Sequence, residues 1–288
     1  MRRSALPVGA VCLLMLSVSG CLTDTPEPDP KSAPSQSQQQ KEKEKEKEKE
    51  KEKPAPAPDP AAAVRAAVAA TGATSARINQ KIELGDSKRT FVLTITGVFD
   101  MARDRGQLSV DFPGGAISHM DEVFDDGRVY VSGPTGLDKD SWGAIRRDKA
   151  EAHYALRAPV NDPEHLLQQV STLEQVSRAG EEKIGGVDTV RYSGRLSSQA
   201  VVLRLTQETR DKWAKVTRSM GGEPPALADV WVDPQGRLVQ ARLSLSMPGS
   251  GGVTNTLTFT DLGTPVEVKL PPAQKTVPLT SITGVLAG

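Results

Sequence analysis

Apolar and polar residues alternate one by one through much of the chain, and this period of two is the feature that most constrains the fold. Leu93, Ile95 and Phe99 fall on one side of an extended chain, whereas Thr94 and Thr96 fall on the other. Because successive side chains of a strand point to opposite faces of a sheet, the pattern predicts strands with one face in the core and one in solvent. The chain must therefore bury one face of a sheet.

The same pattern predicts about ten or eleven strands joined mostly by short turns. Gly127 supplies the positive φ that a hairpin turn at residues 125–127 requires, and Pro234 suits the second position of a type I turn at residues 233–236. Single strands are predicted at residues 78–84, 91–99, 108–112, 187–196, 200–205, 253–261 and 266–270, and hairpins at residues 117–132 and 227–246, while residues 142–145 are a candidate for a further strand. We expect all of these strands to pair in antiparallel fashion.

Three segments change from the period of two to helical spacing. The first is rich in alanine and follows Asp59-Pro60, residue types that suit the N-cap and the first turn of a helix. The predicted helices cover residues 61–70, 163–173 and 206–220. The fold class is therefore α+β.

A sheet of this size with one apolar face has to curl in order to hide that face. Two or three helices cover only part of it. Two arrangements satisfy this requirement: a closed barrel, or an open half-barrel whose concave side is filled by helices, side chains and a ligand.

The first residues have the organisation of a secretory signal peptide. Arg2 and Arg3 precede an apolar run of about a dozen residues, shorter than the run of about 20 that a membrane-spanning helix needs. Residues 18–21, Val-Ser-Gly-Cys, resemble a bacterial lipobox, whose cysteine receives a diacylglyceryl group and becomes the new N-terminus after cleavage. We therefore predict a lipoprotein signal peptide at residues 1–20 and a lipid anchor on Cys21 at the extracytoplasmic face of the cell membrane.

An ordinary signal peptide with a chance cysteine is the alternative interpretation, and the residues after Cys21 weigh against it. Residues 21–60 combine proline clusters with a lysine-glutamate repeat at residues 41–53 and hold little apolar surface to bury. Such a segment is expected to be a disordered tether that reaches about 130 Å when extended. The folded domain is predicted at residues 61–288. Arg2 and Arg3 are compatible with export by either the Sec or the twin-arginine pathway.

Composition excludes several classes of function for the folded domain. Cys12 lies in the signal peptide and Cys21 is the predicted lipid site, so the domain has no disulfide and no thiolate chemistry. Lysine plus arginine and aspartate plus glutamate number 36 each, and aromatic residues make up 4% of the chain. Neither value is typical of a nucleic-acid-binding protein.

The sequence contains no motif that supports catalysis, a metal or a cofactor. His119, His153 and His165 have no histidine or cysteine neighbour at zinc-binding spacing, and we expect Asp121 and Glu122 to lie on a strand surface. The chain has no G-x-S-x-G segment and no glycine-rich phosphate loop. An enzyme is therefore not expected.

Three segments carry a resemblance to a known family. Residues 186–192 (GVDTVRY), 229–238 (DVWVDPQGRL) and 263–272 (GTPVEVKLPP) occur in this order after a lipobox and a flexible tail. Together they resemble the LppX/LprAFG lipoproteins of actinobacteria, relatives in fold of the LolA/LolB lipoprotein carriers. The resemblance covers most of residues 61–288. It implies an open antiparallel half-barrel with helices across its mouth and an apolar cavity for acyl chains, and a lipid or glycolipid as the ligand. The long lysine-glutamate tail departs from the family pattern.

The concave face of such a half-barrel is where acyl chains would bind. The residues predicted to line it are apolar members of the alternating strands: Leu93, Ile95, Phe99, Leu108, Val110, Phe112, Leu243, Leu245, Leu257 and Phe259. The alternative is that these side chains only pack against the covering helices.

Two functions remain as hypotheses. The first is a membrane-anchored extracytoplasmic lipoprotein that binds or shuttles an amphiphilic lipid, with an envelope transporter as a candidate partner. The second is a surface-anchored module with a closed core that binds another envelope protein. Trp142, Trp213 and Trp231 are expected in the core under both hypotheses.

Overall fold

Twelve strands hydrogen-bond into one sheet in the computed structural model of the chain, which describes residues 59–85, 88–114, 118–133, 137–247 and 251–280. These residues all fall in one compact unit, Ala57–Gly288, which contains every residue of the described core. The predicted signal peptide, Cys21 and the tether up to residue 58 lie outside the described residues.

The sheet is open, with β7 at one edge and β12 at the other. Its order is β12-β6-β5-β4-β3-β2-β1-β11-β10-β9-β8-β7. The strands are β1 (Ser75–Gly85), β2 (Thr90–Asp100), β3 (Arg105–Asp111), β4 (His119–Asp125), β5 (Arg128–Ser132), β6 (Trp142–Arg146), β7 (Glu174–Ile184), β8 (Val187–Arg195), β9 (Ala226–Val232), β10 (Leu238–Met247), β11 (Gly251–Thr260) and β12 (Thr276–Pro278).

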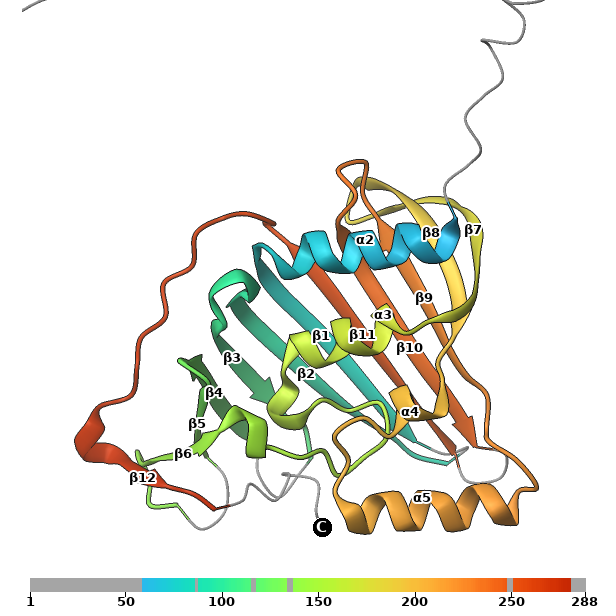
Figure 1. The fold of residues 1–288 in the computed structure, drawn as a ribbon. Coiled ribbons are helices and arrows are strands. Elements are labelled where there is room, and N and C mark those ends of the chain that lie inside the picture. The colour runs from blue at the N-terminus through green and yellow to red at the C-terminus, as the bar shows by residue number, and fades with distance from the viewer. Residues whose placement is uncertain (1–58, 86–87, 115–117, 134–136, 248–250, 281–288) are drawn as a thin grey trace, which may run out of the picture. The chain divides into compact units, whose positions relative to one another are not determined.

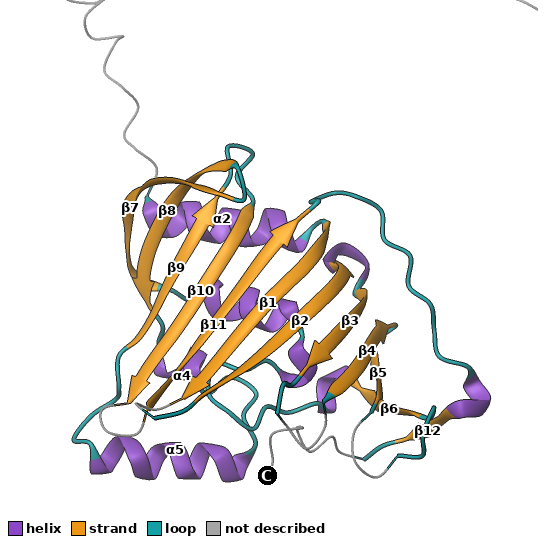
Figure 2. Cartoon of the chain, turned by 180° about the vertical axis from the view of Figure 1, so that it is seen from behind, coloured by secondary structure: helices purple, strands orange, loops and turns teal. Residues whose placement is uncertain are grey.

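Helices lie over one face of this sheet (Figure 1). They are α2 (Pro60–Gly72), α3 (Pro163–Ser171) and α4 (Ser198–Val201), while α5 (Gln207–Ser219) lies at the end of the sheet where β1 ends. Figure 2, seen from behind, shows the strands in front of α2 and α3. Four single-turn 3₁₀ segments complete the described elements: η1 (Met101–Arg103), η2 (Arg147–Lys149), η3 (Pro159–Asn161) and η4 (Ala273–Lys275). The prediction of an α+β open half-barrel with helices on its concave side is confirmed.

Capping residues define the starts of the helices. Asp59 accepts hydrogen bonds from the backbone N–H groups of Ala61 and Ala62 at 3.3 and 3.2 Å. Asp162 caps α3 through the N–H of Glu164 at 3.0 Å. Each cap satisfies backbone donors that have no partner within the helix, which is why both helices begin where the sequence predicted. No helix among the described residues has the length and apolarity needed to cross a bilayer.

Three predictions for the sheet are wrong. Residues 200–205 are not a strand, because Ser197 caps the N–H of Ala200 at 3.2 Å and starts the short helix α4. Residues 266–270 are not a strand either. They belong to a long connection from β11 toward β12 in which Pro265, Pro271 and Pro272 lack backbone donors. The sheet is also not wholly antiparallel, since β12 pairs with β6 in parallel.

Strand β7 was not predicted, because almost all of its side chains are exposed and it has no apolar period. It is an edge strand and, among the strands that the structure describes, it pairs only with β8. Its register shifts twice along β8, and such irregularities protect an edge strand from pairing with other chains.

Candidate functional site

The ten residues predicted to line the concave face lie together on that face. Two of them, Ile95 of β2 and Val110 of β3, are direct register partners. All ten are at most 3% exposed and belong to one apolar core cluster. Whether they also hold acyl chains stays a prediction.

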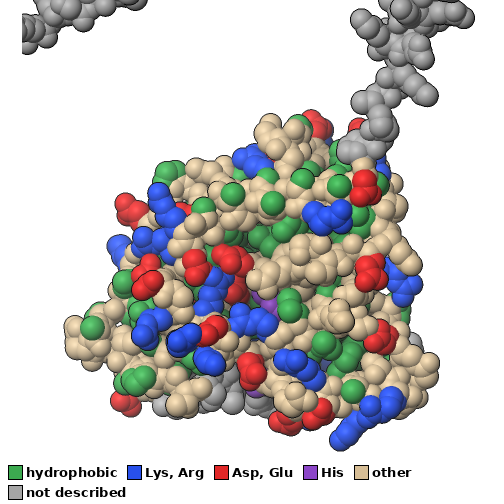
Figure 3. Space-filling view, in the orientation of Figure 1, with side chains coloured by type: hydrophobic (Ala, Val, Ile, Leu, Met, Phe, Trp, Pro, Cys, Tyr) green, Lys and Arg blue, Asp and Glu red, His purple; other side chains and the backbone are tan. Residues whose placement is uncertain are grey.

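The covering helices fill the space above these ten residues. Val64 and Ala67 of α2 and Leu166 and Val170 of α3 belong to the same core cluster. Thr71 of α2 accepts a hydrogen bond from the N–H of Leu238 at 2.8 Å, which fixes the end of α2 to β10. Figure 3 shows apolar side chains between α2 and α3.

Arg147 connects the covering helix α3 to the sheet. Its guanidinium lies 5.6 Å from the ring centres of both Phe99 and Phe124, which contact each other edge to face with centroids 5.1 Å apart. It donates two hydrogen bonds to the Asp162 carboxylate, at 2.7 and 2.6 Å. Asp104 pairs with the same group, and Glu164 does so at 3.3 Å. Arg147 therefore ties the start of α3 and the η1–β3 turn to two aromatic side chains of the core.

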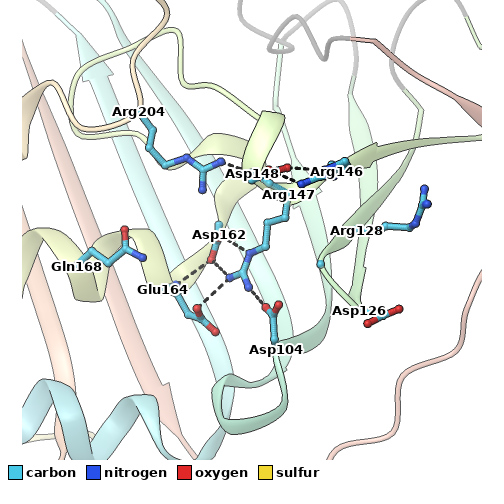
Figure 4. Close-up of a pocket in the computed structure, with 11 residues that line it drawn as sticks. Asp104, Asp126, Arg128, Arg146, Arg147, Asp148, Asp162, Glu164, Gln168 and Arg204 are labelled. Carbon is cyan, nitrogen blue, oxygen red and sulfur yellow. Dashed lines mark hydrogen bonds and ion pairs between the residues drawn. The ribbon is translucent and has the colours of Figure 1, made fainter.

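A charged cleft opens beside this arginine (Figure 4). Its volume of about 560 Å³ falls in the range of about 300–1,000 Å³ that small-molecule sites occupy. We call it the charged cleft; it is lined by Asp104, Asp126, Gly127, Arg128, Arg146, Arg147, Asp148, Asp162, Glu164, Gln168 and Arg204. Arg204 donates to the backbone carbonyl of Ala150 at 2.9 Å, and Arg146 pairs with Asp148. Burial raises the pKa of Glu164. The cleft can hold a polar group with both donors and acceptors.

A small polar cavity of about 30 Å³ lies beneath the segment that connects β6 to α3. Glu122 of β4 is fully buried and accepts a hydrogen bond from the side-chain amide of Asn161 at 2.8 Å. Burial raises the pKa of Glu122 to about 8, although the bond from Asn161 and the charge of the buried Arg157 oppose this rise. These three side chains line the cavity, whose size suits one water molecule. The expectation that Glu122 lies on a strand surface is wrong.

Another polar pair lies in the middle of the concave face. The side-chain amide of Gln80 donates to Asn255 Oδ1 at 2.8 Å, and Asn255 Nδ2 donates to the carbonyl of Leu156 at 2.9 Å. Both side chains are at most 4% exposed. The pair therefore fixes the segment before α3 to the centre of the sheet.

His165 lies on the buried side of α3, 2% exposed. Among the described residues neither ring nitrogen has a hydrogen-bond partner. Burial lowers its pKa to about 4, so the ring is neutral at pH 7. His119, in contrast, is half-exposed and pairs with Asp111 at 2.8 Å and Asp121 at 3.3 Å on the sheet surface, where its hydrogen bond to the Asp111 carboxylate raises its pKa.

Sequence reasoning missed the charged cleft and the buried polar groups. None of the ten predicted residues lines the charged cleft or the small polar cavity, nor the cavity of about 500 Å³ beside β7, β8 and the β9–β10 turn. The sequence identified Asp162 only as the N-cap of a helix. The only indication of the charged cleft in the sequence was the run Arg146-Arg147-Asp148 at the end of a predicted strand. This run has no periodic pattern of its own.

No family model matches the chain, and no curated protein is similar to it. Among solved structures, LprF from Mycobacterium bovis is similar, with 16% sequence identity and a TM-score of 0.45 over 75% of this chain and 98% of that one. Lipoprotein LppX from Mycobacterium tuberculosis is similar with 16% identity and a TM-score of 0.41, over 73% and 97% of the two chains.

A LolA superfamily protein from Nitrosomonas europaea is a third similar structure, with 9% identity and a TM-score of 0.29 over 73% of this chain and 96% of that one.

Proposed function

We propose that this chain is an exported lipoprotein, anchored through diacylglyceryl-modified Cys21, that binds an amphiphilic lipid or glycolipid between the concave face and its covering helices. In this proposal residues 1–20 are the signal peptide, residues 21–60 the tether and residues 61–288 the binding domain. The observation that carries it is an open sheet whose apolar face is covered by short helices, with apolar side chains reaching the surface between α2 and α3.

The energy for binding comes from burying methylene groups. Each contributes about 0.8 kcal/mol, so a chain of about sixteen carbons gains roughly 12 kcal/mol before the entropic cost of binding. No catalytic group is needed for this. Because the ten concave residues are already packed, an acyl chain is accommodated only when α2 or α3 moves away from the sheet.

The charged cleft supplies a place for the polar end of such a ligand. Arg147 belongs both to the cleft and, through Phe99 and Phe124, to the edge of the apolar core. A lipid whose headgroup lies in the cleft would therefore reach the concave face with its acyl chains.

Native mass spectrometry of the chain from residue 22 onward tests lipid binding, because this part contains the whole described core. We expect co-purified lipid. Leu257→Phe, which adds volume on the fully buried concave face, should reduce the amount or the chain length of that lipid. Leu227→Phe is the matched control, since Leu227 is 49% exposed. Lipid-free protein, or equal effects of the two variants, would contradict the proposal.

The anchor is tested separately in a bacterium that processes lipoproteins. We expect the N-terminal peptide to begin at an acylated Cys21 and the wild-type chain to stay with the membrane fraction. Cys21→Ser should prevent acylation. An unmodified cysteine in processed wild-type protein would rule out the anchor.

The packed interior favours a second candidate function, a surface-anchored module with a closed core that binds an envelope protein. All ten concave residues contact one core cluster, as such a module requires. A pull-down with the same chain separates the two functions, because a stable protein partner together with absence of lipid supports the second.

A further inference from the structure

One buried amide oxygen on the concave face has no hydrogen-bond partner. Gln80 of β1 is 4% exposed, and the described residues supply no donor to its Oε1. Its two register neighbours, Ile95 of β2 and Leu257 of β11, are apolar and fully buried. A single unpaired acceptor therefore lies in the middle of an apolar surface.

The hydrogen bonds beside Gln80 fix which atom of its amide is unpaired. Asn255 Nδ2 donates to the backbone carbonyl of Leu156 at 2.9 Å, so Asn255 presents Oδ1 to Gln80. Gln80 Nε2 donates to this oxygen at 2.8 Å, which leaves Gln80 Oε1 at the free end of the two bonds. Turning the Gln80 amide over would place two acceptors against each other. The hydrogen-bond network therefore assigns the unpaired position to the oxygen.

A buried acceptor without a donor lowers stability, because it has lost its water and gained no bond in return. An ordered water is a poor partner at this position. A buried water needs about two to four polar partners, and the side chains of Ile95 and Leu257 supply none. Gln80 also lines none of the three cavities described above. The missing donor therefore has to come with a molecule that enters between the sheet and its covering helices.

We propose that Gln80 Oε1 accepts a hydrogen bond from a hydroxyl or amide N–H group carried on the acyl chain of the bound lipid. The inference rests on the proposed function, in which the lipid lies against the concave face. A lipid whose chains carry only ester groups offers acceptors and no donor, so it would leave Gln80 Oε1 unpaired. The ligand class is therefore a lipid with a hydrogen-bond donor in its chain region, as in hydroxylated or amide-linked acyl chains.

The donor is expected well away from the headgroup. In the proposed function the headgroup lies in the charged cleft, which reaches the core where Arg147 lies over Phe99. Phe99 and Ile95 are four residues apart on β2, and four residues of a strand span roughly 13 Å. Ile95 is the register partner of Gln80. The hydroxyl or amide group is thus expected in the middle of the acyl chain and not beside the headgroup.

Binding of matched fatty acids to the protein from residue 22 onward tests the proposal. The probes are stearic acid, the same acid with a hydroxyl in the middle of its chain, and the same acid with a hydroxyl next to the carboxyl group. Displacement of a fluorescent fatty acid measures the affinity of each. We expect the acid with the mid-chain hydroxyl to bind about five-fold more tightly than stearic acid, the gain from one neutral hydrogen bond. The acid with the hydroxyl next to its carboxyl group should bind as stearic acid does.

Paired substitutions test whether the two amides on the concave face cause this preference. Gln80→Leu/Asn255→Leu removes both amide groups and should abolish the preference for the mid-chain hydroxyl. Gln240→Leu/Thr258→Val is the matched control, because Gln240 donates to Thr258 at 2.9 Å across neighbouring strands on the opposite face of the sheet. The control should keep the preference. Circular dichroism confirms that each variant is folded.

Two results would overturn the inference and leave the proposed function in place. One is equal binding of stearic acid and the mid-chain hydroxy acid by the wild type. The other is an unchanged preference in the Gln80→Leu/Asn255→Leu variant. Absence of binding by all three acids would also overturn the inference, and if the protein in addition purifies without lipid, the proposed function fails with it.

Discussion

Arg147 and Asp162 form a two-bond ion pair, with nitrogen-oxygen distances of 2.7 and 2.6 Å, that joins η2 to the first turn of α3. Both side chains are largely withdrawn from water, with 11% and 4% of their surface exposed. Asp162 also caps α3, so one carboxylate both stabilises the start of this helix and binds Arg147. The position of α3 over the concave face therefore depends on this pair.

Arg147→Met is expected to lower the free energy of unfolding by about 3–5 kcal/mol, because it leaves the buried Asp162 carboxylate without its charged partner. Urea unfolding of the two proteins measures the change. Arg146→Met is the control, since Arg146 and Asp148 form an exposed pair that should contribute about 0–1 kcal/mol. Similar losses in the two variants would show that the Arg147 pair has no special role.

Glu122→Gln is expected to change how stability depends on pH between about 4.5 and 8. The pKa of Glu122 is raised from 4.5 to about 8, so the unfolded chain releases this proton at lower pH than the folded chain. Wild-type stability should fall as pH rises between these values, by about 1.4 kcal/mol per pH unit for this one group. The glutamine variant lacks this loss.

The measurement is the difference in unfolding free energy between wild type and Glu122→Gln from pH 5 to pH 8, at about one-unit intervals. Glu267→Gln, at an exposed position in the β11–β12 connection, is the control. A difference that stays constant across this range would mean that Glu122 is ionised in the folded chain.

His165→Gln is expected to change the acid side of the stability profile. The pKa of His165 is lowered from 6.5 to about 4 because the charged ring would be buried. Between these values the unfolded chain binds the proton first, so wild-type stability should fall as pH decreases from 6.5 to 4. The variant should lose less over this interval. NMR titration of the wild-type ring gives an independent reading, and an ordinary histidine pKa would refute the prediction.

The strands with alternating side chains were predictable because burial of one face leaves its period in the sequence. The hairpin of β9 and β10 is an example, since its turn at residues 233–236 follows local chemistry. Strand β7 was not predictable in this way, because an exposed edge strand is stabilised by backbone pairing with β8 and needs no apolar residues.

The charged groups of the site could not be predicted, because their partners are distant in sequence. Arg147 meets Asp104 and Asp162 only after the sheet and α3 have been assembled. Glu122 directly follows another acidic residue, Asp121, in the sequence. It becomes buried only when the segment that connects β6 to α3 packs over β4. Alternation alone did not reveal that an acidic residue occupies a core position of that strand.

Close packing of Phe99 on Gly106 leads to the last prediction. The two residues are direct partners across β2 and β3, and a Cβ at Gly106 would lie 2.2 Å from Cδ2 of the Phe99 ring. Gly106→Ala must displace this ring, which also contacts Phe124 and lies under Arg147. We expect a loss of about 1–3 kcal/mol in the free energy of unfolding.

A double-mutant cycle with Phe99→Leu separates this contact from other effects of the alanine. The smaller leucine should relieve the clash, so the double variant should lose less stability than the two single losses combined. Gly72→Ala is the control, because no atom lies within 4 Å of the Cβ position there. Strict additivity of the Gly106 and Phe99 changes would mean that the ring moves aside freely, and Phe99 would then not fix the position of Arg147 above it.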